Sequence, residues 1–160
     1  MLIDEELNMK RMLAGILMVL MLASMLALGV SAKENEKSED VIYFDNGDYL
    51  VISITESVAR ASGRKSGKTT YNYYGEDGVR EWSAVLSGTF TYNGSSAACT
   101  ASSCSVSISD TAWYVISKTA SKSGSTATAN LTMGRKLLGV TINKVPVTMT
   151  LSCDANGNLS

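Results

Sequence analysis

One segment of the chain alternates between apolar and polar side chains over most of its length. Apolar or small residues occupy every second position from Trp82 to Tyr92, and polar residues fill the positions between them, with Val85 as the exception. A repeat of two places successive side chains on opposite faces of an extended strand, whereas a helix needs a repeat near 3.6. The segment therefore predicts a long β-strand with one buried face.

Shorter stretches of the same pattern continue through the rest of the chain. We expect further strands at 41–44, 49–54, 69–74, 104–108, 113–115, 127–133, 139–142 and 145–153. Asn46-Gly47 predicts a hairpin, Gly124 marks a turn, and Gly134 is expected to end the strand before it. The fold class is all-β, and we expect a single immunoglobulin-like antiparallel β-sandwich of about seven to nine strands.

The N-terminal segment has the layout of a secretory signal peptide. Lys10 and Arg11 precede the apolar run 12–30, which ends in small residues at Ser31-Ala32. We expect residues 1–32 to form a signal-peptide helix, with translation starting at Met9 because acidic residues in 1–8 oppose a basic leader. The alternative is an uncleaved membrane anchor, since this apolar run is just long enough to span a bilayer.

Export divides the chain into three parts and sets its chemistry. Residues 33–40 are charged and predict a flexible linker, and 41–160 form the β-sandwich domain of a secreted protein. Without 1–32, the remaining Asp and Glu residues equal the Lys and Arg residues in number. This balance gives no attraction to nucleic acid, and the only membrane contact that we expect is through the signal segment.

The residue types in the chain give little support for an enzyme. The chain has no histidine, which excludes the common nucleophile–base sets and histidine-containing zinc sites. Residues 63–69 resemble a phosphate-binding loop but are one residue short and precede a strand, so we expect no nucleotide. The loop at 154–158 lacks the glutamate of a calcium site. We therefore expect no cofactor, no metal and no catalytic residue.

Two features could bind a ligand on an extracellular surface. Arg64, Lys65 and Lys68 lie in a short basic loop, and Tyr71 and Tyr73 share one face of the following strand. Clustered cations attract anionic polymers, and flat aromatic rings can pack against sugars. We expect these five residues to bind a cell-surface glycan or an anionic wall polymer, although a solvated loop and core tyrosines are the plainer alternatives.

The three cysteines are Cys99, Cys104 and Cys153, and an exported chain is expected to form one disulfide and leave one thiol free. Spacing alone does not choose among the three pairings. Alternation puts Cys104 in phase with the inward-facing Val106 and Ile108, so Cys104 is as good a partner as Cys99 on this criterion.

Three blocks of sequence carry a resemblance to a known group of proteins. They are GTFTYNGSSAACT at 88–100, SKTASKSGSTATA at 117–129 after the Trp113 strand, and TMTLSCDANGNLS at 148–160. Together they resemble small secreted β-sandwich proteins of Gram-positive bacteria. The resemblance implies an exported β-sandwich, and it implies Cys99 and Cys153 as the disulfide pair with Cys104 as the free thiol.

We therefore expect a secreted, non-enzymatic β-sandwich that serves as a binding or cell-surface-associated module. The alternative function is a secreted competition protein of the bacteriocin type, which shares the exported layout.

Overall fold

The computed structural model describes residues 35–57 and 63–160, with side chains from residue 39 onward. The expected signal peptide at 1–32, residues 33 and 34, and Arg60 in the basic segment lie outside the described residues. The chain divides into two compact units, Met1–Ala32 and Lys33–Ser160, and the second is described here by itself.

The described part of the second unit is built from eight antiparallel strands and contains no helix. The strands are β1 (Asn35–Tyr43), β2 (Tyr49–Glu56), β3 (Arg64–Tyr74), β4 (Arg80–Tyr92), β5 (Ala97–Ile108), β6 (Trp113–Ser123), β7 (Thr126–Leu137) and β8 (Val140–Ser152). The predicted all-β class and the predicted number of strands are confirmed. No helix in this described part is long and apolar enough to cross a membrane.

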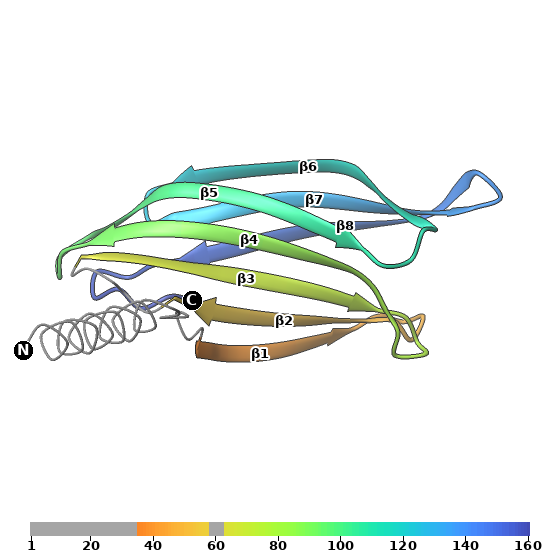
Figure 1. The fold of residues 1–160 in the computed structure, drawn as a ribbon, viewed down its shortest axis with the longest axis horizontal. Coiled ribbons are helices and arrows are strands. Elements are labelled where there is room, and N and C mark those ends of the chain that lie inside the picture. The colour runs from red at the N-terminus through yellow and green to blue at the C-terminus, as the bar shows by residue number, and fades with distance from the viewer. Residues whose placement is uncertain (1–34, 58–62) are drawn as a thin grey trace, which may run out of the picture. The chain divides into compact units, whose positions relative to one another are not determined.

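The eight strands form two sheets that pack as a sandwich (Figure 1). One sheet has the order β1-β2-β3-β4-β5 and the other has the order β6-β7-β8, so every hydrogen-bonded neighbour is also a neighbour in sequence. An immunoglobulin sandwich instead places strands from distant parts of the chain side by side. The two-sheet antiparallel arrangement is therefore shared with that class, and the strand order is different.

The core lies between the two sheets and follows the predicted alternation. Trp82, Ala84, Leu86 and Phe90 of β4 are completely buried, as the repeat of two predicts. They face Ala127, Ala129, Leu131 and Met133 of β7 and Val147, Met149 and Leu151 of β8, all of which are buried. A Cβ added at Gly88 would lie 2.7 Å from the Phe90 ring and 3.3 Å from Leu151, so this glycine permits close packing between the sheets.

The structure differs from the sequence-based expectations at the start of the sandwich. Residues 35–40, expected to be a flexible linker, form the first part of β1 and pair with β2 from Asn35↔Glu56 to Asp40↔Ile52. This strand lies at the edge of its sheet. Charged residues are tolerated in an edge strand because it has only one hydrogen-bonded neighbour.

The expected strand break at Gly134 is wrong. β7 continues to Leu137, and residues 140–142 open the long strand β8 instead of forming a strand of their own. A Cβ at Gly134 would lie 2.7 Å from the Tyr114 ring, so the glycine leaves space for an aromatic side chain of the neighbouring strand. A glycine inside a strand can thus serve packing without ending the strand.

Candidate functional site

Four of the seven connections between strands lie at the same end of the sandwich (Figure 1). They are 44–48, 75–79, 109–112 and 138–139, which follow β1, β3, β5 and β7. This arrangement results directly from a chain of antiparallel strands, because every second connection returns to the same end. The connections 93–96 and 124–125 and the residues after β8 lie at the opposite end.

All twelve exposed large apolar side chains of the described part lie at this one end. Each is no more than four residues from one of its four connections. They are Val41, Ile42, Tyr43, Phe44, Val79, Ile108, Val115, Ile116, Leu137, Leu138, Val140 and Ile142. We call this set the apolar end. Because soluble proteins rarely gather exposed apolar side chains so strongly, the apolar end is our candidate interaction surface.

The most exposed part of the apolar end is the hairpin between β7 and β8. Leu138 is 97% exposed and Leu137 is 60% exposed, and they are followed by Val140 at 66% and Ile142 at 57%. Leu137 pairs with Val140 across a two-residue loop, Leu138-Gly139. Figure 1 shows that this hairpin extends past the other three connections at the same end.

A pocket of about 540 Å³ lies beside this hairpin. It is lined by residues of the 44–48 connection, by residues of the first half of β8 and by Tyr73 near the C-terminal end of β3. Phe44 and Val145 supply apolar surface, and Asp45, Asn46 and Lys144 supply polar groups. The lining of the pocket thus combines apolar side chains with charged groups of both signs.

A buried hydrogen-bond network fixes the 44–48 connection against the core. The Tyr73 hydroxyl donates to Asp48 Oδ2 at 2.5 Å, and the Asn46 side-chain amide donates to the same oxygen at 2.7 Å. Tyr73 also stacks on Trp82, with ring centroids 4.9 Å apart. Burial is the main cause that raises the pKa of Tyr73 far above its ordinary value, and the contact with Asp48 adds to it.

A second polar group at this end is only partly satisfied. Glu81 is buried, and its Oε1 lies 3.6 Å from the Arg135 guanidinium. Burial raises the pKa of the Glu81 carboxyl, while Arg135 and the nearby Trp113 indole act in the opposite direction. Glu81 Oε2 and Trp113 Nε1 face no partner within hydrogen-bond geometry. Glu81 also lines an acidic pocket of about 280 Å³ that includes Asp48, Glu76 and Asp77.

The two predicted ligand-binding tyrosines lie on the inner face of β3. Tyr73 is 1% exposed and belongs to the core, so its ring is covered by Trp82 and Trp113. Tyr71 is half-buried, and its hydroxyl donates to the Thr148 carbonyl oxygen at 3.5 Å. The plainer alternative, core tyrosines, describes Tyr73 fully and Tyr71 in part.

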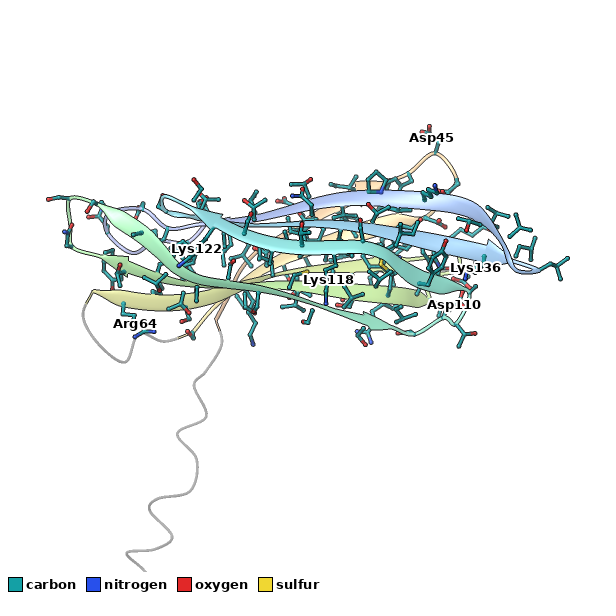
Figure 2. All side chains as sticks on the ribbon, turned by 90° about the horizontal axis from the view of Figure 1, so that it is seen from above. Asp45, Arg64, Asp110, Lys118, Lys122 and Lys136 are labelled. Atoms are coloured by element: carbon teal, nitrogen blue, oxygen red, sulfur yellow. The ribbon has the colours of Figure 1, made fainter. Side chains whose placement is uncertain are left out.

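The three predicted basic residues lie on strand β3 and not in a loop. Arg64 and Lys68 are exposed on the outer face, opposite to the two tyrosines. Lys65 forms an ion pair with Glu56, with 2.6 Å between Lys65 Nζ and Glu56 Oε2. The structure therefore does not bring the basic residues and the tyrosines together into one surface. Figure 2 shows Arg64 at the opposite end of the sandwich from Lys136 and Asp110.

The three cysteines are not bonded to one another in this structure. The Cys99 backbone N–H donates to the Gly124 carbonyl at 2.8 Å, and the Cys153 N–H donates to the adjacent Ser125 carbonyl at 3.0 Å. Both side chains are buried, and burial is the main cause that raises the pKa of each thiol. Cys104, on β5, is half-buried, and its pKa is raised for the same reason.

Within residues 35–57 and 63–160, no group of three or more acidic or cysteine side chains is placed to hold a metal ion. The sequence-based reasoning missed the apolar end altogether. Its signal was the run Leu137-Leu138-Gly139-Val140, in which a Leu-Gly pair occupies the place of a polar turn.

Comparison with protein-family models, with curated proteins and with solved structures finds no match to this chain.

Proposed function

We propose that this chain is an exported, non-enzymatic β-sandwich that binds the cell surface through its apolar end. The observation that carries the proposal is the segregation of exposed apolar side chains, all of which lie at one end of the described sandwich. Exposed apolar side chains gathered on one part of a protein mark an interaction site. Export is supported by the basic start, the apolar run and the small residues of the N-terminal segment.

A non-enzymatic role is supported by the residues that could act as nucleophiles or bases. The chain has no histidine, and the pKa of each thiol is raised by burial, which lowers the fraction of reactive thiolate. Asp48 already accepts hydrogen bonds from Tyr73 and Asn46. These properties are better explained by stabilisation of the fold than by catalysis.

Export also bears on the cysteines. We propose Cys99 and Cys153 as the disulfide pair of the exported protein and Cys104 as the free thiol. The backbone N–H groups of Cys99 and Cys153 donate hydrogen bonds to the carbonyls of Gly124 and Ser125, which are adjacent in sequence. Cys99 also contributes to the raised pKa of Cys153. Cys104 lies further along β5, where it pairs with Leu86 of β4.

The expected ligand classes, a cell-surface glycan or an anionic wall polymer, remain part of the proposal. Arg64 and Lys68 offer two exposed cations on the outer face of β3 for such a polymer. A pull-down of purified residues 33–160 with intact cells and with isolated walls tests this, at low and at high salt. Binding lost at high salt supports contact through cations, and binding that survives salt supports the apolar end. Absence of binding to either material contradicts the proposal.

A second candidate function, a secreted competition protein of the bacteriocin type, is favoured by the same hairpin. An apolar projection on an exported protein could act on the envelope of another cell. A growth-inhibition assay against related strains separates the two, because a surface module is expected to bind cells without inhibiting them.

A further inference from the structure

The tip of the β7–β8 hairpin has an unusual residue at its turn. Leu138 has φ of +50° and Gly139 has φ of +82°, which is the pattern of a two-residue turn with both central residues in the left-handed region. Asn-Gly and Asp-Gly are preferred in this turn, because a bulky side chain disfavours positive φ. Leu138 is the only residue other than glycine with positive φ in the described part of the chain.

Folding alone does not explain a leucine at this position. Its side chain is almost fully exposed, so it contributes nothing to the core, while its backbone conformation is unfavourable. Strained conformations of this kind often occur where function requires a particular side chain. A function that needs an aliphatic group at the extreme end of a hairpin accounts for both the exposure and the strain.

The charge of the surrounding sheet indicates what this aliphatic group meets. Residues 111–153, which include all of β6, β7 and β8, contain five basic residues and no acidic residue. Lys136 lies directly behind the tip, where it pairs with Thr141, and its ammonium is 4.2 Å from the centre of the Tyr114 ring. Lys144 lies two pairs further back, opposite Gly134. Arg135 is also at this end, and it forms an ion pair with Glu81.

Most acidic groups at the same end belong to the other sheet, and Asp110, in the 109–112 connection between the two sheets, is the exception. Asp45, Glu76 and Asp77 lie in the 44–48 and 75–79 connections, which end short of the β7–β8 tip (Figure 1). The projecting hairpin therefore carries four aliphatic side chains, with Lys136 behind them and Lys144 and Tyr114 further back, on either side of Gly134. Aliphatic side chains at a tip, with basic and aromatic side chains behind them, match the hydrocarbon core of an anionic bilayer and the headgroup region that borders it.

We propose that the β7–β8 hairpin inserts its tip into lipid bilayers that carry anionic headgroups. Leu138 enters the acyl region with Leu137, Val140 and Ile142 around it, and Lys136 and Lys144 contact the headgroup phosphates. This inference rests on the proposed function of surface binding and names lipid as the ligand class. A projecting tip with cations behind it fits a bilayer better than it fits a neutral glycan.

The test is sedimentation of purified residues 33–160 with lipid vesicles. All the described core residues belong to this unit, which supports studying it without the N-terminal apolar run. The vesicles contain phosphatidylcholine alone, or phosphatidylcholine and phosphatidylglycerol in equal parts. We expect binding to the anionic vesicles and at least a fivefold weaker affinity for the neutral ones, since each lysine near the surface contributes about 1 kcal/mol, or roughly fivefold.

Leu138→Asn is the decisive variant. Asparagine tolerates positive φ, so this change keeps the turn and removes the aliphatic group. We expect about tenfold weaker vesicle binding with a melting temperature that is unchanged or higher. Lys144→Gln is expected to weaken binding about fivefold, and Lys122→Gln, at the opposite end (Figure 2), serves as the matched charge control with wild-type binding.

Several outcomes overturn the lipid inference. They are equal binding to both kinds of vesicle, wild-type binding by Leu138→Asn, or a wild-type dimer that this variant converts to a monomer. If vesicles are not bound while cells or walls are, the lipid inference fails and the proposed function stands. If vesicles, cells and walls all fail to bind, both are contradicted.

Discussion

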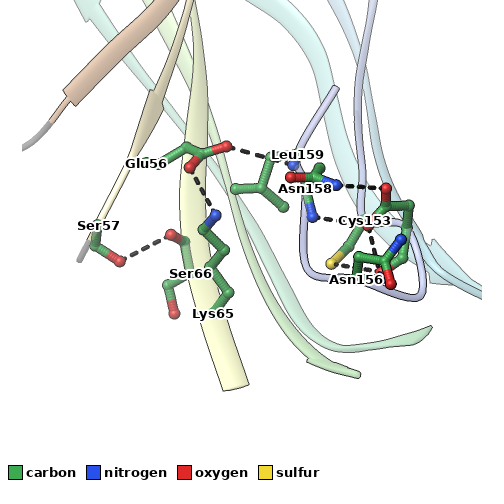
Figure 3. A network of polar contacts seen from close by, with 9 residues as sticks. Glu56, Ser57, Lys65, Ser66, Cys153, Asn156, Asn158 and Leu159 are labelled. Atoms are coloured by element: carbon green, nitrogen blue, oxygen red, sulfur yellow. Dashed lines mark hydrogen bonds and ion pairs between the residues drawn. The ribbon is translucent and has the colours of Figure 1, made fainter. Parts of the chain in front are cut away.

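The side chain of Leu159 lies directly against the backbone of Gly67, so the end of the chain packs onto the middle of the larger sheet. Leu159 is fully buried, and its backbone N–H donates to Glu56 Oε1 at 3.4 Å. The loop before Leu159 is held together by the Asp154 carboxylate. It accepts hydrogen bonds from the backbone N–H groups of Asn156 and Asn158 and from the Asn158 side-chain amide (Figure 3). These contacts attach the residues after β8 to β2 and β3.

Substitutions at Leu159 and Gly67 are therefore expected to be coupled. Leu159→Ala removes a buried side chain and is expected to lower the free energy of unfolding by about 2–5 kcal/mol. Gly67→Ala adds a methyl group where Leu159 already lies and is expected to lower it by about 1–3 kcal/mol. In the double variant the added methyl group occupies space that the Leu159 side chain has left. We therefore expect the free energy of unfolding to fall by less than the sum of the two single decreases, as measured by denaturant unfolding. Additive losses would show that the two residues do not share this space.

We expect the Tyr73 hydroxyl to contribute to the free energy of unfolding, and we expect no such contribution from the Tyr71 hydroxyl. Tyr73→Phe removes the 2.5 Å hydrogen bond to Asp48 in a buried site, and we expect a loss of about 1–3 kcal/mol in the free energy of unfolding. Tyr71→Phe is the matched control on the same face of β3, because its hydroxyl makes only a long, exposed bond to Thr148. Equal effects of the two substitutions in thermal or denaturant unfolding would contradict the network described here.

Glu81 is expected to make stability depend on pH. Burial raises the pKa of its carboxyl in the folded state, so the folded protein holds this proton more tightly than the unfolded chain does. Its contribution to stability is then greatest below the unfolded pKa, about 4.3, and is lost as pH rises through the folded pKa.

Glu81→Gln imitates the protonated carboxyl at every pH. We expect the variant to be more stable than the wild type near neutral pH and to approach it at acidic pH, as seen in melting temperatures measured across the range. A variant that is less stable than the wild type at neutral pH would mean that the ion pair with Arg135 outweighs the cost of burial.

The oxidised protein is expected to contain a Cys99–Cys153 disulfide. Peptide mapping by mass spectrometry of non-reduced residues 33–160 identifies the pair. Because the bridge closes a long loop, Cys153→Ser is expected to lower the free energy of unfolding by about 3–4 kcal/mol under oxidising conditions, in a chain-entropy account. Cys104→Ser is the control and is expected to have a small effect. A bridge that contains Cys104 would refute the pairing.

The strands were predictable where a local pattern determines them. The alternation from Trp82 to Tyr92 needs only one buried face, and the hairpin at Asn46-Gly47 needs only a glycine that accepts positive φ; Gly47 has φ of +87°. The β7–β8 hairpin escaped prediction because Leu138 adopts a conformation that its residue type disfavours. Gly134 was misleading because its role depends on the Tyr114 ring of another strand.

The candidate site was harder to predict than the strands. Tyr73 and Arg64 are close in sequence, yet they face opposite sides of β3 and serve different parts of the molecule. The apolar end gathers residues from β1 to β8 that are up to a hundred positions apart, such as Tyr43 and Ile142. The sequential order of antiparallel strands brings these residues to one end, and the alternation within a single strand does not specify that order.

The most direct test of this account compares the binding of wild-type residues 33–160 and of Leu138→Asn to intact cells. Lys122→Gln, at the opposite end, is the control. If the apolar end is the binding surface, the wild type and the control are expected to sediment with the cells, while Leu138→Asn remains largely in solution with an intact fold by circular dichroism. Equal sedimentation of a folded Leu138→Asn variant and the wild type would contradict the assignment of the apolar end as the binding surface.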